Sequence, residues 1–76
     1  MTTPIFQLVR QIENDDIGLR AMRLITKLGV ETVERLAQYS TPFLKSQTAE
    51  PEAVVEALGR LLNDKYHLHF SETYRR

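Results

Sequence analysis

The segment 24–36 constrains the fold of this chain most, because it contains the end of one helix, a stop signal and the start of another. Three apolar residues at i, i+1 and i+4 share one stripe of the first helix: Leu24, Ile25 and Leu28. Gly29 can adopt the left-handed conformation that ends a helix without a Cβ penalty, which lets Val30 fold back onto the last turn. Thr32 is then a good N-cap for a second apolar stripe that begins at Val33.

Similar apolar periods in the rest of the chain predict a compact all-α bundle of four to five short helices, with an extended C-terminal segment. The predicted helices cover residues 4–12, 17–28, 33–39, 42–46 and 51–65. All except the helix 42–46 have apolar residues at i, i+3, i+4 or i+7, and in that helix Phe43 and Leu44 pack inward. Thr3 is the predicted N-cap of the first helix, and Pro4 is its first residue. Thr41 and Pro42 have the same roles in the predicted helix 42–46. We predict one domain over residues 1–76, in which residues 70–76 form a loose tail.

Three positions leave alternatives open. Residues 13–16 are polar and favour a turn in which Asp15 or Asp16 caps the next helix, although one continuous helix over residues 4–28 is the rival. Phe6 lies off the first apolar stripe and either widens the buried face or lies on the surface. Gly59 lies inside the last helix, where it marks either a close helix crossing or a tolerated surface position.

The C-terminal region changes its period from that of a helix to that of a strand. Tyr66, Leu68 and Phe70 alternate with His67 and His69, as in a strand with one apolar face. A single strand cannot satisfy its own backbone groups. We therefore expect this segment to pair with a second copy, to join a partner's sheet, or to lie as an extended arm that packs only its side chains. In the first two cases the three apolar residues bind a partner.

Composition narrows the functions available to the chain. Ten basic and ten acidic residues give zero net charge, which disfavours a nucleic-acid partner and permits a homodimer. A core this small gains stability from oligomerisation or from a protein partner. There is no cysteine, and the sequence has neither a signal peptide nor an apolar stretch of membrane-spanning length. We expect a cytoplasmic protein that does not bind a membrane.

Few residues are suited to catalysis or to cofactor binding. His67 and His69 have a spacing that zinc sites use, but the sequence offers no obvious third or fourth ligand. No nucleotide-binding or metalloprotease motif is present. We therefore expect neither an enzyme nor a metal or other cofactor.

Three cations lie at i, i+3 and i+7 on the outer face of the second long helix: Arg20, Arg23 and Lys27. They form either a solvated face, in which Asp16 supports Arg20 at i, i+4, or a docking stripe for an acidic partner or a phosphate backbone.

Residues 30–36, Val-Glu-Thr-Val-Glu-Arg-Leu, match a helix link of the form Ile/Val-x-Thr-Ile/Val-x-x-Leu. With the apolar residues Leu44, Leu58, Leu62 and Leu68, this link makes residues 19–70 resemble the C-terminal domain of the bacterial RNA polymerase alpha subunit. The resemblance implies a similar fold, in which Arg20 falls where that family has a DNA-contacting arginine. The family grips the DNA backbone with a Leu-Gly-Lys-Lys-Ser hairpin, whereas this chain has the acidic segment 49–53 there.

The sequence as a whole predicts a small non-catalytic protein–protein interaction module that self-associates, such as a regulator, an adaptor or an assembly factor. The alternative is a nucleic-acid or transcription-complex binding domain with the alpha-subunit fold. The predicted partner-binding residues form two sets: Tyr66, Leu68 and Phe70, and Arg20, Arg23 and Lys27.

Overall fold

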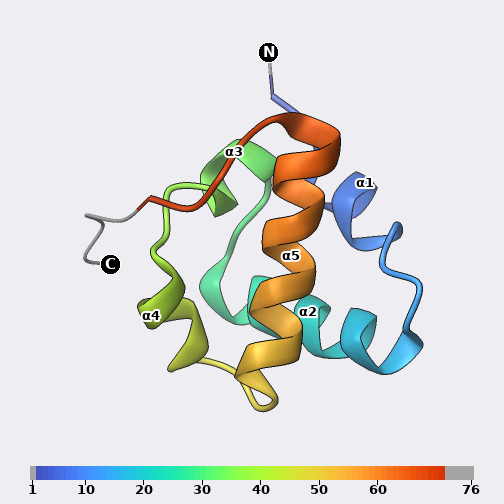
Figure 1. The fold of residues 1–76 in the computed structure, drawn as a ribbon, viewed down its shortest axis with the longest axis vertical. Helices are drawn as coiled ribbons and strands as arrows, with labels where there is room; N and C mark the ends of the chain where they lie inside the picture. Colours follow the sequence, from blue (N-terminus) through green and yellow to red (C-terminus); the bar gives the residue numbers. More distant parts are fainter. Residues whose placement is uncertain (1, 72–76) are drawn as a thin grey trace.

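The computed structural model describes residues 2–71 and confirms the all-α prediction. It has five helices, and in Figure 1 the other four lie around α5, which runs through the middle of the molecule. They are α1 (Ile5–Val9), α2 (Asp15–Leu28), α3 (Val33–Leu36), α4 (Thr41–Lys45) and α5 (Pro51–Tyr66). The part of the chain described contains no strand, only an isolated antiparallel bridge between Pro4 and Thr32.

The link between α2 and α3 has the predicted structure. Gly29 is left-handed, with φ 71°, and its N–H donates to the carbonyls of Ile25 and Thr26. The Val30 N–H donates to the Ile25 carbonyl at 3.1 Å, so the chain turns back and Val30 is buried. Thr32 Oγ1 then accepts a hydrogen bond from the Arg35 N–H at 3.1 Å and caps α3. Local interactions therefore form the turn and the cap of this link, and the N-terminal segment adds long-range hydrogen bonds, from the Ile5 N–H to the Glu31 carbonyl and from the Val33 N–H to the Thr3 carbonyl.

A turn separates α1 from α2, so the continuous-helix alternative is wrong. Asn14 caps α2, with its Oδ1 accepting from the Ile17 N–H at 3.1 Å, and the expected caps Asp15 and Asp16 are the first two residues of the helix. The side chain of Phe6 lies on the surface. The two predicted threonine caps are each displaced by one residue.

Ser40, not Thr41, caps α4, since Ser40 Oγ accepts from the Phe43 N–H at 3.4 Å. At the first helix Pro4 occupies the N-cap position, and no side chain caps α1. Thr3 instead bonds to Glu34, far along the chain. Thr3, which the sequence predicts to cap α1, therefore donates its hydrogen bonds to a carboxylate that is distant along the chain.

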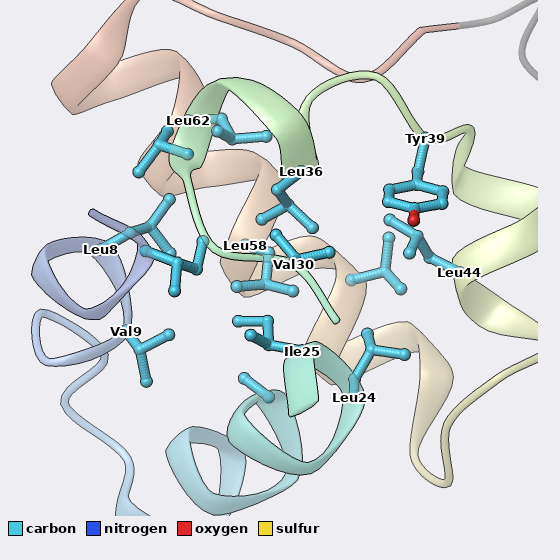
Figure 2. Packing of buried hydrophobic residues seen from close by; sticks show 14 of the residues in the cluster. Leu8, Val9, Leu24, Ile25, Val30, Leu36, Tyr39, Leu44, Leu58 and Leu62 are labelled. Atoms are coloured by element: carbon cyan, nitrogen blue, oxygen red, sulfur yellow. The ribbon is translucent and has the colours of Figure 1, made fainter. Parts of the chain in front are cut away.

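One apolar core holds the helices together. Leucines from α1, α2, α3, α4 and α5 converge on it, and Tyr39 closes it beside Leu44 (Figure 2). The completely buried leucines are Leu8, Leu36, Leu44, Leu58 and Leu62. The Tyr39 ring stacks on the ring of Phe43, with centroids 5.5 Å apart. α5 is the element on which α1, α2 and α4 pack, and α3 packs on α1.

The C-terminal segment is an extended arm that packs on its own domain. Tyr66 is still helical, and left-handed His67 (φ 58°) ends α5 and breaks the period-2 pattern. The Leu68 N–H donates to the Leu62 carbonyl at 2.9 Å. Phe70 is buried against Gly59, where a Cβ atom would lie 3.3 Å from Phe70 Cε2. Gly59 therefore marks a close contact with an aromatic ring, not with a crossing helix.

The loose tail does not begin at residue 70. The Ser71 N–H donates to the carbonyls of Ala37 at 3.0 Å and Tyr39 at 3.1 Å, and Phe70 belongs to the core. The rest of the predicted tail, residues 72–76, lies outside the described residues. The arm therefore joins the end of α5 to the segment between α3 and α4, as Figure 1 shows.

Glu34 anchors the N-terminal segment and predicts a pH-dependent stability. The Thr3 N–H donates to Glu34 Oε1 at 2.9 Å, which lowers the pKa of this carboxyl from its ordinary value of 4.5. The Thr3 hydroxyl donates to Oε2 at 3.3 Å. Since the folded pKa is the lower one, the stabilisation is present above pH 4.5 and is lost as the pH falls through the folded pKa.

We expect Glu34→Gln to lower Tm at neutral pH and to leave Tm close to that of the wild type well below pH 4.5. Thermal unfolding followed by circular dichroism at both pH values measures the difference. Glu31→Gln is the matched control, because the Glu31 side chain is exposed and makes no side-chain hydrogen bond within residues 2–71. Equal pH profiles for the two variants would contradict the assignment.

Candidate functional site

The three cations predicted as a docking stripe line one hollow. Arg20, Arg23 and Lys27 lie on the exposed side of α2, opposite the buried residues Ala21 and Ile25. The loop between α4 and α5 forms the other wall, through Gln47, Thr48 and Ala49. Lys27 Nζ donates to the Gln47 carbonyl at 3.4 Å and ties the two walls together. We call this site, formed by the three cations and residues 47–49, the basic hollow.

The basic hollow is positively charged, because three cations and no carboxylate line it. The expected support of Arg20 by Asp16 is absent, since the ion pairs within residues 2–71 join Lys45 to Glu52 and Glu56 to Arg60. Those two pairs line a different hollow, beside Phe70, in which acidic and basic side chains balance. Three cations that converge without a counter-charge favour an anionic ligand.

The size of the basic hollow restricts that ligand. Its volume of about 200 Å³ is smaller than the roughly 300–1,000 Å³ of small-molecule pockets. Arg20 is half-buried and lies beside the loop, whereas Arg23 and Lys27 are exposed. The hollow therefore suits a single acidic group or side chain that belongs to a larger partner.

The second predicted set of partner-binding residues packs within the domain. Tyr66 Oη accepts a hydrogen bond from Gln11 Nε2 at 3.0 Å, and Phe70 is 8% exposed in the core. Leu68 is half-buried against the same core. The structure does not bring this set near the basic hollow. Tyr66 lies at the C-terminal end of α5 and Phe70 packs on Gly59 in its middle, whereas the loop of the basic hollow precedes its N-terminal end.

Two parts of this surface were not predicted from the sequence. Residues 47–49 reach the cations only through the packing of α4 and α5. Leu19, which lies to one side of the apolar stripe of α2, is 52% exposed beside the basic residues. Its angle on the helix, which points away from Ala21 and Ile25, was the signal that could have revealed it.

Within residues 2–71 no group of three or more histidine, aspartate or glutamate side chains is arranged to hold a metal ion. His67 and His69 are exposed at the end of α5 and on the arm. No helix in this part of the chain combines the length and the apolar character needed to cross a membrane.

Comparison of the chain with known protein families, with characterised proteins and with solved structures yields no match.

Proposed function

We propose that this chain is a small non-catalytic protein–protein interaction module, a regulator, adaptor or assembly factor, that binds an acidic segment of another protein. The observation that carries the proposal is the basic hollow, where Arg20, Arg23 and Lys27 converge with no carboxylate among the lining residues. Charge complementarity of this kind steers association and selects the partner. On the sequence argument alone, we also propose that the module acts in the cytoplasm.

A protein partner suits the charges better than a nucleic acid does. Duplex DNA has one negative charge per about 1.7 Å, so it is bound by extended basic surfaces. The cations here span only residues 20–27, about 10 Å of helix. Glu50 and Glu52 follow the loop that lines the hollow and would repel a continuing phosphate backbone. A short acidic protein segment avoids both carboxylates.

The second candidate function is nucleic-acid or transcription-complex binding. The placement of Arg20 beside the loop that precedes α5 supports it, because the resemblance to the alpha-subunit domain implies DNA contacts from these two places. It predicts binding that weakens steeply with salt and is lost on Arg20→Ala.

The proposed partner is a different protein, not a second copy. A homodimer built through residues 66–70 would require Phe70 to leave the core and Ser71 to break its two hydrogen bonds.

Charge reversal of the basic hollow tests the proposal. We expect the triple variant Arg20→Glu, Arg23→Glu and Lys27→Glu to recover at least about tenfold less partner in affinity capture from host lysate, because each attraction becomes a repulsion. The matched control reverses three exposed cations on other surfaces: Arg10, Arg35 and Lys65. Both variants change the net charge equally, and their circular dichroism spectra establish that they are folded.

Each capture is run with and without nuclease, followed by mass spectrometry. A protein that survives nuclease, is lost with the triple variant and is retained with the control supports the proposal. Equal loss with both variants contradicts it, because non-specific charge then explains the binding. Partners that disappear with nuclease favour the second candidate.

A further inference from the structure

The exposed face of α2 has a second row of residues beside its cations. Leu19, Met22 and Thr26 follow the same i, i+3, i+7 spacing as the basic residues, each one position earlier in the chain. A shift of one residue rotates a row by about 100° around the helix, so the two rows run side by side. Leu19 is 52% exposed, and Met22 is half-buried. The face therefore has a basic side and an apolar side.

The two rows form one continuous surface. Met22 and Thr26 line an open hollow of about 380 Å³ together with Arg23 and Lys27. The same two cations line the basic hollow on their other side. The aliphatic stems of these cations extend the apolar strip while their charged ends stay in water. We call the surface made by the two rows the α2 docking face.

We infer that the partner segment is amphipathic: its carboxylates bind the basic row, and at least one large apolar side chain covers Leu19 and Met22. This inference rests on the proposed function and specifies the chemistry of the partner. Charge complementarity determines the acidic side of the segment. The exposed side chain of Leu19 determines the apolar side of the segment, because a purely ionic partner would leave the apolar surface of Leu19 in water. The two rows span residues 19–27, which is about 12 Å along α2 and equals the length of two to three turns of a partner helix.

Two synthetic peptides of equal length and equal charge test the inference. Both are fluorescein-labelled and rich in glutamate; one has leucine at i, i+3, i+4 and i+7, and the other has serine at those positions. In fluorescence anisotropy titrations we expect the leucine peptide to bind the full chain at least about tenfold more tightly, because it buries apolar surface against α2. Reversing the three cations should weaken the binding of both peptides.

Leu19→Ser is expected to remove the advantage of the leucine peptide and to leave the binding of the serine peptide unchanged. The matched control is Phe6→Ser on α1, since Phe6 is a similarly exposed apolar residue, 61% exposed, outside both rows. This control should retain the advantage. Both substitutions are at exposed positions, and thermal unfolding verifies that the variants are folded.

The outcomes separate the inference from the proposed function. Equal, salt-dependent binding of both peptides overturns the apolar part and leaves the acidic-partner proposal intact. The same advantage in Leu19→Ser as in Phe6→Ser also overturns the apolar part. If neither peptide binds, or if a duplex DNA oligonucleotide binds more tightly than both, the inference and the proposed function fail together.

Discussion

Replacing Leu58 by alanine is expected to lower the free energy of unfolding by about 3–5 kcal/mol. Leu58 is completely buried in α5, the helix that contacts α1, α2 and α4. The substitution removes apolar contacts and leaves a cavity that a small close-packed core fills only in part. Domains of this size have total stabilities near the low end of roughly 5–15 kcal/mol, so much of the variant should be unfolded at room temperature. Urea unfolding followed by circular dichroism measures the change.

Leu19→Ala is the matched control, because it makes the same chemical change at a position that is 52% exposed. We expect its stability to stay within about 0.5 kcal/mol of the wild type. If the two variants lost equal stability, the assignment of Leu58 to the core and of Leu19 to the surface would be wrong. The pair therefore tests the packing of α5 separately from the helix propensity of alanine.

The second large effect is expected at the C-terminal arm, where Phe70→Ala should cost about 3 kcal/mol. The ring is 8% exposed and packs against the backbone of Gly59. The two hydrogen bonds of the Ser71 N–H keep the chain beside Ala37 and Tyr39, so loss of the ring should also loosen this attachment. Thermal unfolding measures the cost, and amide hydrogen exchange at Ser71 reports the loosening.

His69→Ala provides the comparison for the arm, since this neighbouring side chain is exposed. Its effect should stay within about 0.5 kcal/mol. A loose tail that begins at residue 70 predicts no loss for either variant. Equal free energies of unfolding for Phe70→Ala and His69→Ala would therefore support a loose tail that begins at residue 70 and contradict the packing of Phe70 in the core.

Much of the fold could be predicted because neighbouring residues determine it. Gly29 ends α2 through its own left-handed backbone, and Thr32 caps α3 through an N–H three residues later. The same locality explains why the predicted caps at Thr3 and Thr41 were only one residue away from the N-cap positions of the structure. Which of two adjacent residues caps a helix depends on small differences in backbone angles that a sequence pattern does not specify.

The candidate site was predictable only in part. Helical spacing alone places Arg20, Arg23 and Lys27 on one face, and the structure confirms that arrangement. The loop that turns this face into a hollow comes from a distant part of the chain. The absence of a carboxylate there also depends on where every other helix places its acidic residues, which no local pattern reports.

The sequence by itself determined the helical class, the stop at Gly29 and the basic row, because each depends on residues within one or two helical turns. Only the tertiary structure decided the place of the C-terminal arm. The period-2 pattern of residues 66–70 was compatible with a paired strand or with an arm. The missing side chain of Gly59 left a space on α5 that the ring of Phe70 fills. In the structure, burial of that ring keeps the arm on its own domain, where the backbone N–H groups of Leu68 and Ser71 are satisfied.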